Sequence, residues 1–264
     1  MKREGLHGLI QYLNKTTVEN TNTQVARTIL NNRKIIPEIS LEKLAHDNYL
    51  SQASVSRFIK QQGYKNIQEY RHDFISTQSL IKINASNYKK NVDQKDNLTI
   101  KEQIKKDIQL AFNDLDNIDL DKLETIIKII NNYSTVVFIG SEFSLANMYL
   151  VQLAMINNGI NAYCYSDPIM MIDNLNNITN DCIVICISCS GMWYESSSNR
   201  RLREILFTHN FTNILFTSQG HHLDENKFDY VYKYGTQHSG DISCYVQLTY
   251  FTPILRDMYI RHFQ

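Results

Sequence analysis

The stretch from Ile183 to Gly191 constrains the fold of this chain more than any other part of the sequence. It reads Ile-Val-Ile-Cys-Ile-Ser-Cys-Ser-Gly, an apolar run that ends in small hydroxyl residues and a glycine. Runs rich in Ile and Val are typical of a central parallel strand buried on both faces. A helical pattern begins at about Trp193. A strand that ends in Ser-x-Ser-Gly and opens a helix predicts an anion site, because helix-start N–H groups and short hydroxyls can bind a negative charge.

Strand and helix patterns alternate through the rest of the C-terminal part. This alternation predicts βαβ units and an α/β fold with a parallel sheet of about five strands, covered by helices on both faces. The expected strands are 135–139, 161–165, 182–187, 212–217 and 229–233. The expected helices are 100–116, 120–132, 143–158, 168–176, 193–209 and 241–263. We place this domain at 106–264.

The N-terminal part is predicted to be all α-helical. Two helices are expected within 5–32, followed by helices over 41–47, 51–62 and 67–78. Ser40 and Ser51 stand where N-caps are needed, and Gly63 stands where a helix end favours a left-handed residue. We place this domain at 1–78. Residues 79–105 are expected to form a linker, since 82–98 are rich in Asn, Lys, Asp and Ser.

Charge is divided unequally along the chain, although the net charge is zero. Residues 1–90 contain 14 Lys and Arg against 7 Asp and Glu, whereas 91–264 contain 13 against 20. A basic first third beside an acidic remainder indicates that only the first third meets a polyanion. A chance partition of charge is the alternative.

The two short helices over 41–47 and 51–62 have the spacing of a helix-turn-helix. Leu44 and Ala45 on the first helix can pack against Val55 and Phe58 on the second, with Leu50 in the turn. Side chains that can reach DNA bases and phosphates occupy the rest of the second helix: Ser51, Gln52, Ala53, Ser54, Ser56, Arg57 and Lys60. An amphipathic helix pair in an ordinary bundle would have the same spacing, so that alternative stays open.

Several functional classes are not favoured by the composition. No apolar run reaches 18 residues and the N-terminus has no continuous hydrophobic region, so we expect no membrane span, no signal peptide and a cytoplasmic protein. The pair Cys186-x-x-Cys189 has redox-motif spacing, but its first residue falls within the expected strand, so buried reduced thiols are the preferred interpretation. No His and Cys cluster has zinc-ligand spacing, and we expect no metal and no cofactor.

The N-terminal pattern resembles a known family. Leu44-Ala45, the run Ser51 to Phe58 with its Val-Ser-Arg-Phe end, and Gly63-Tyr64 resemble the DNA-binding domain of RpiR-type transcriptional regulators. One departure is Tyr49, which stands where that family usually has Gly. Either Asn48 or Tyr49 must then take up a left-handed conformation, at a cost of about 1 kcal/mol.

RpiR-type regulators carry a SIS (sugar isomerase) domain after the DNA-binding domain, and about 120–264 resemble one. The resemblance lies in three strand ends, 140–144, 188–195 and 216–218. It implies a sugar-phosphate site lined by Ser144, Ser188, Ser190, Gly191 and Thr217. Two residues depart from the family pattern: Glu142 replaces a Gly and adds negative charge, and Trp193 replaces a Thr and removes a hydroxyl.

These patterns together predict a DNA-binding transcriptional regulator of carbohydrate metabolism. We expect it to bind double-stranded DNA as a homodimer or tetramer and to sense a phosphorylated sugar or amino sugar, without being an enzyme. A sugar-phosphate isomerase is the first alternative, with Glu195, His221, His222 and His238 as candidate bases by residue type. A SIS dimerisation scaffold with a degenerate ligand site is the second.

Overall fold

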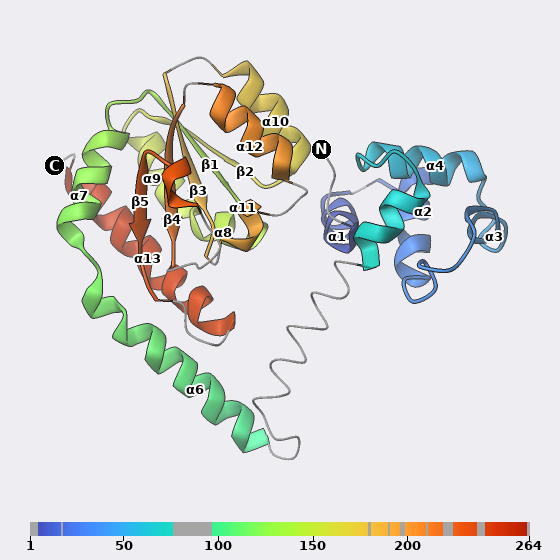
Figure 1. The fold of residues 1–264 in the computed structure, drawn as a ribbon, viewed down its shortest axis with the longest axis horizontal. Coiled ribbons are helices and arrows are strands. Elements are labelled where there is room, and N and C mark those ends of the chain that lie inside the picture. The colour runs from blue at the N-terminus through green and yellow to red at the C-terminus, as the bar shows by residue number, and fades with distance from the viewer. Residues whose placement is uncertain are drawn as a thin grey trace. The chain divides into compact units, whose positions relative to one another are not determined.

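The computed structural model describes two compact units, residues 1–90 and 91–264 (Figure 1). The described residues run from 5 to 262, without 17, 76–96, 179–180, 190, 196–198, 210, 219–223 and 237–240. No helix in these described ranges is long and apolar enough to cross a membrane.

The N-terminal unit is helical throughout its described residues. Its helices are α1 (Gly5–Lys15), α2 (Thr21–Asn31), α3 (Leu41–His46), α4 (Gln52–Gln61) and a further helix over 67–75. Their buried side chains form one core: Leu9, Val25, Ala26, Ile29, Ile36, Ile39, Leu44, Ala45, Val55, Phe58, Ile59, Tyr64, Tyr70 and Phe74. These elements agree with the helices expected from the apolar spacing.

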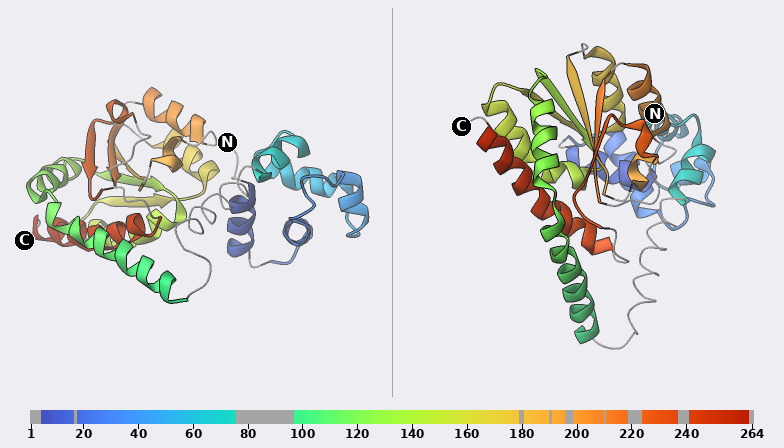
Figure 2. Two further views of the ribbon diagram at one scale, coloured as in Figure 1. Left: turned by 60° about the horizontal axis from the view of Figure 1, so that its bottom comes forward. Right: turned by 60° about the vertical axis from the view of Figure 1, so that its left-hand side comes forward.

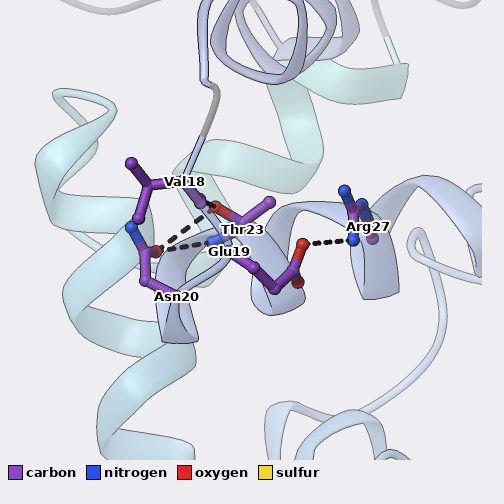
Figure 3. Close-up of polar contacts among 5 residues, drawn as sticks. All are labelled: Val18, Glu19, Asn20, Thr23 and Arg27. Atoms are coloured by element: carbon purple, nitrogen blue, oxygen red, sulfur yellow. Dashed lines mark hydrogen bonds and ion pairs between the residues drawn. The ribbon is translucent and has the colours of Figure 1, made fainter.

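Local polar contacts set the start of α2 (Figure 3). The Asn20 side chain caps the helix by accepting a bond of 3.0 Å from the Thr23 N–H. The Thr23 hydroxyl donates to the Val18 carbonyl at 2.9 Å, and Arg27 pairs with Glu19 at 2.5 Å. The cap satisfies an N–H that has no partner within the helix, and this fixes the start of α2 directly after Asn20.

The turn between α3 and α4 contains a strained residue. Tyr49 has φ of 55°, the one positive φ outside glycine in the described backbone. Its ring is 100% exposed, so packing does not offset the strain. The Leu50 N–H closes the turn on the Ala45 carbonyl at 2.9 Å, and Ser51 then caps α4. The prediction that Asn48 or Tyr49 would be left-handed is confirmed at Tyr49.

The C-terminal unit contains a five-stranded parallel sheet within its described residues. The strands are β1 (Thr135–Gly140), β2 (Asn161–Tyr165), β3 (Cys182–Ile187), β4 (Thr212–Thr217) and β5 (Tyr230–Lys233), in the order β2-β1-β3-β4-β5. The register pairs Val136 with Ile183 and Ile185 with Ile214. The predicted α/β class and parallel sheet are confirmed.

Helices cover both faces of the sheet, as the three views show (Figures 1 and 2). The helices α7 (Leu120–Ile130), α9 (Tyr149–Asn157) and α13 (Asp241–His262) share one core with alternate strand residues such as Phe138, Ile185 and Phe216. The other face is covered by α10 (Pro168–Asn177) and α12 (Arg200–Thr208). Because both faces are buried, β3 is apolar at every position, which explains its Ile and Val content.

Three expected elements differ in the structure. In place of one helix over 143–158, the structure has α8 (Glu142–Asn147) followed by α9. Met148 caps the end of α8, and its N–H bonds to the Leu145 carbonyl in a turn tighter than an α-helix. In place of one helix over 193–209, the structure has α11 (Met192–Glu195) and α12. The linker expected over 79–105 lies mostly outside the described residues, and its last part, 97–105, belongs to α6 (Asn97–Asn113), which packs on α13.

Candidate functional site

The carboxyl ends of β1 and β3 form the topological switch point of the sheet. The two strands are neighbours, but the chain leaves β1 toward β2 on one side and leaves β3 toward β4 on the other. The loops therefore diverge above the two strands, and ligands of open α/β sheets bind in the crevice between such loops. All three loops that resemble the SIS pattern follow β1, β3 and β4, so the structure brings them to one edge.

Ser188 is the polar residue most directly placed at this point. It continues β3, and its N–H donates to the Phe216 carbonyl at 3.1 Å. Its side chain is buried, with 2% exposure, and its hydroxyl has no hydrogen-bond partner among the described residues. An unsatisfied buried hydroxyl costs stability, so this group is suited to a ligand that supplies the missing bond.

Ser144 lies beside this loop in α8. The Ser141 hydroxyl caps α8 by accepting from the Ser144 N–H at 3.2 Å, and the two hydroxyls are 2.9 Å apart. Ser144 is therefore buried in a polar network, and a ligand would have to compete for its hydroxyl.

Thr217 fastens the loops to each other. Its hydroxyl lies 2.7 Å from the Ser188 carbonyl and 2.6 Å from the Ser218 carbonyl. Ser218 bonds to the Cys189 carbonyl through both its N–H and its hydroxyl. The Thr217 hydroxyl has one proton to donate, and these carbonyls already accept it. Thr217 therefore holds the Ser188 loop in place rather than binding a ligand.

The glycine of the Ser-x-Ser-Gly motif has φ of 80°, and this left-handed conformation favours glycine at position 191. Gly191 turns the chain into α11, and its carbonyl accepts the Glu195 N–H at 3.1 Å. Because α11 spans 4 residues, its dipole is much weaker than that of the long helix expected from the sequence. Ser190, the other predicted ligand residue of this loop, lies outside the described residues.

The sequence favoured a buried, reduced thiol at Cys189, and in the structure it is a free thiol that is half-buried. The Tyr234 hydroxyl donates to its sulfur at 3.2 Å. Cys244, in the first turns of α13, also influences it. The bond with Cys244, together with those from Tyr234 and Ser144, lowers the pKa of the Cys189 thiol from 9.0 to about 7, against the opposing effect of burial. Only the fold brings residues 189, 234 and 244 together, so sequence spacing gave no signal.

The two residues that depart from the SIS pattern differ in their exposure to solvent. Glu142 is exposed in the first turn of α8, whereas Trp193 is half-buried in α11. The Trp193 carbonyl accepts a bond of 2.6 Å from the Asn199 amide, and Glu195 is also half-buried. The candidate bases His221, His222 and His238 lie outside the described residues. Among the described residues, no group of three His, Cys, Asp or Glu side chains could hold a metal ion.

A groove of about 350 Å³ lies away from the serine loops, between α8, α9 and α13. Its walls include Leu150 and Pro253 and are mainly apolar. None of the predicted ligand residues lines this groove. The switch-point site is identified by its loops and their hydrogen bonds.

The predicted DNA-contacting residues lie along α4 in the N-terminal unit, from its N-cap Ser51 to Lys60 in its last turn. Ser51, Gln52, Ala53, Arg57 and Lys60 are exposed, while Ser54 and Ser56 are half-buried. Ser51 is engaged as the N-cap, accepting from the Ser54 N–H at 3.0 Å. The opposite face, with Val55, Phe58 and Ile59, is buried in the core. The helix therefore presents a polar face that its own unit does not cover.

No family model and no curated protein sequence matches the chain. Among solved structures, the Vibrio vulnificus NanR protein complexed with ManNAc-6P is similar over 97% of this chain and 92% of its own, with a TM-score of 0.52 and 15% identity. The protein c3406 of Escherichia coli CFT073 is similar over 64% of this chain and 95% of its own, with a TM-score of 0.50 and 16% identity.

The C-terminal unit has a SIS-type α/β fold. A third similar structure, from Listeria monocytogenes and provisionally named a sugar-phosphate isomerase, covers 64% of this chain and 93% of its own, with a TM-score of 0.50 and 12% identity. Similarity at these identities establishes the fold alone. The SIS resemblance of the C-terminal unit is thus confirmed at the level of the fold.

Proposed function

We propose that this protein is a cytoplasmic transcriptional regulator that binds DNA through α4 and a phosphorylated sugar or amino sugar through its SIS-type unit. The observation that carries the proposal is the buried Ser188 hydroxyl at the switch point of that unit, which has no hydrogen-bond partner in the part of the chain that the structure describes. It lies on the same chain as a basic helical unit with an exposed polar helix.

The ligand part of the proposal follows from the chemistry of the three loops. Ser188 offers a hydroxyl that no described residue bonds to, and Gly191 exposes its backbone in the same loop because it has no side chain. Among similar structures, NanR is complexed with ManNAc-6P. A sugar phosphate combines hydroxyls with an anion, and both can be bound by hydroxyl and N–H donors of this kind.

The DNA part follows from α3 and α4. Gln52, Arg57 and Lys60 lie on the exposed part of α4, where a recognition helix would contact bases and phosphates. Recognition of two half-sites requires two copies of the chain. A homodimer is supported by apolar side chains that are exposed on α9: Tyr149, Leu150, Leu153 and Ile156.

Two measurements test this function. Fluorescence anisotropy with DNA from the region upstream of its own gene should give saturable binding at modest salt, and thermal shift with a panel of sugar phosphates should identify a stabilising ligand. Ser188→Ala should remove the ligand shift without weakening DNA binding. Failure to bind any DNA would refute the regulator, and failure of every sugar phosphate would leave a scaffold with an unused site.

A sugar-phosphate isomerase is the rival function. Glu195 supports it, because this carboxylate lies at the end of α11, one short turn after the Ser-x-Ser-Gly loop. Turnover of an aldose or ketose phosphate that is lost in Glu195→Gln would favour the enzyme. A ligand that stabilises the protein and changes its DNA affinity without being converted would favour the regulator.

A further inference from the structure

The ring of Tyr49 lies entirely in solvent. It is 100% exposed, and the next most exposed large hydrophobic side chains among the described residues are Val18 at 63% and Tyr149 at 62%. A large apolar side chain stabilises a fold when it is buried against its own chain. The Tyr49 ring is not buried, so it contributes nothing to the core of the N-terminal unit.

The backbone at position 49 also disfavours a side chain. Its φ of 55° is left-handed, a conformation that glycine adopts freely and that a residue with a Cβ adopts only under strain. Asn48 tolerates this conformation better, but it is engaged at the end of α3, where its side-chain amide donates to the Leu44 carbonyl at 2.8 Å. Strained residues concentrate at ligand-binding sites. A strained tyrosine that its own unit does not stabilise therefore indicates a partner outside the unit.

The position of Tyr49 in the chain indicates where that partner lies. Tyr49 is in the turn between α3 and α4, two residues before the N-cap Ser51 (Figure 1). In a helix-turn-helix bound to DNA, the N-terminal residues of the second helix enter the major groove. The turn directly before that helix then comes close to the DNA backbone that borders the groove.

The charge of the unit suits a polyanion. Residues 1–90 contain 14 Lys and Arg against 7 Asp and Glu, and Arg57 and Lys60 are exposed on α4. Asp47, the carboxylate nearest to Tyr49 in sequence, lies 3.3 Å from the His46 imidazole. A DNA duplex matches this charge, because each of its phosphates carries a negative charge.

We propose that Tyr49 is a DNA-contacting residue whose phenol hydroxyl donates to a backbone phosphate beside the groove that α4 enters. Tyrosine hydroxyls are among the side-chain donors that bind DNA phosphates, and such contacts position a protein on the duplex without reading its sequence. The contact fixes the start of α4 relative to the groove. The proposal rests on the proposed DNA binding by α4.

A neutral donor has its own signature in DNA binding. The slope of log affinity against log salt concentration reports the phosphates that Lys and Arg neutralise, and a phenol neutralises none. Tyr49→Phe removes only the hydroxyl. It should weaken binding to specific and unrelated DNA alike, by about three- to tenfold, and leave the salt slope unchanged.

Tyr49→Gly separates binding from folding. Glycine relieves the strain at φ of 55°, so this variant should unfold at a higher urea concentration than the unaltered protein. It should nevertheless bind DNA at least as weakly as Tyr49→Phe does. A residue with a purely structural role would not weaken DNA binding in a more stable protein, and the variant cannot lose binding by failing to fold.

Fluorescence anisotropy of the full chain measures binding, with a duplex from the region upstream of its own gene and an unrelated duplex of the same length. Tyr230→Phe is the control, because it removes the hydroxyl of an exposed tyrosine in the C-terminal unit and should bind as the unaltered protein does. Unchanged affinity in both Tyr49 variants would overturn the proposal, and so would a loss confined to Tyr49→Gly, since the hydroxyl would then make no contact. If the unaltered protein binds neither duplex, the proposed function fails as well, so the two failures are distinguishable.

Discussion

A Cβ atom on Gly140 would lie 2.7 Å from the carbonyl oxygen of Ile187. The two residues are register partners at the ends of β1 and β3, so the two strands approach more closely there than any side chain permits. The first strand end of the SIS pattern begins at this glycine, and its role is to let the Ser144 and Ser188 loops start side by side. The backbone contact therefore sets the geometry of the candidate site.

Gly140→Ala should accordingly destabilise the C-terminal unit by roughly 1–3 kcal/mol, because the carbonyl contact forces the strand ends apart. Gly159→Ala is the comparison: it adds left-handed strain of about 1 kcal/mol at φ of 86° but has nothing within 4 Å of an added Cβ, so a larger loss in Gly140→Ala reports the clash. Urea denaturation measures both. If the thermal shift caused by a sugar phosphate is weakened only in Gly140→Ala, strand spacing matters to the site. A Gly140→Ala protein with the same unfolding free energy as the unaltered protein would refute the close approach.

Thr217→Val should cost roughly 1–3 kcal/mol of unfolding free energy, because it removes the hydroxyl that bonds to the buried Ser188 carbonyl. The size of the side chain hardly changes, so the loss reports the hydrogen bond. Thr125→Val is the control, since the exposed Thr125 hydroxyl bonds only to its own helix at Asp121. We expect less than about 0.5 kcal/mol there. Equal effects in the two variants would show that Thr217 does not hold the loop.

Much of the fold could be predicted because the apolar pattern determines it. The runs 182–187 and 212–217 are strands at the predicted positions, since a strand buried on both faces leaves a continuous apolar signal. The break at Met148 has no such signal, because its cause is a tighter backbone turn inside an apolar stretch. The contact between Cys189 and Tyr234 has no sequence signal for a related reason: the two residues are distant in sequence, and only tertiary packing brings them together.

The strain at Tyr49 gives a stability prediction for the N-terminal unit. Tyr49→Gly should raise its unfolding free energy by up to about 1 kcal/mol, because glycine takes φ of 55° without a Cβ clash. Tyr49→Ala keeps the strain and removes only the exposed ring, so it should leave stability unchanged. Thermal unfolding of the full chain, followed by a signal from the N-terminal unit, measures both. Equal stabilisation by Gly and Ala would indicate that the ring, and not φ, is responsible.

The lowered pKa of Cys189 predicts how stability depends on pH. The thiol has a pKa of about 7 in the folded protein against 9.0 ordinarily, so its stabilising contribution is present above pH 9 and is lost as pH falls toward 7. Under reducing conditions, the difference in unfolding free energy between the unaltered protein and Cys189→Ser should therefore increase from pH 7 to 9. For Cys164→Ser the difference should decrease above pH 9, because burial raises that pKa to about 11. A Cys189 difference that does not vary with pH would contradict the thiolate.

Arg57 and Lys60 should contribute differently to DNA binding by α4. Arg57→Ala should weaken binding to the specific site by about tenfold or more and reduce its preference over unrelated DNA, because a guanidinium can read a base edge. Lys60→Ala should weaken binding to all DNA alike, as expected for a contact with the phosphate backbone of DNA. The slope of log affinity against log salt concentration should decrease in magnitude by about one. Lys122→Ala, on the exposed face of α7, is the control and should bind as the unaltered protein does. Anisotropy titrations over a range of salt concentrations measure all three, and losses that are equal in Arg57→Ala and Lys122→Ala would show that α4 is not the recognition helix.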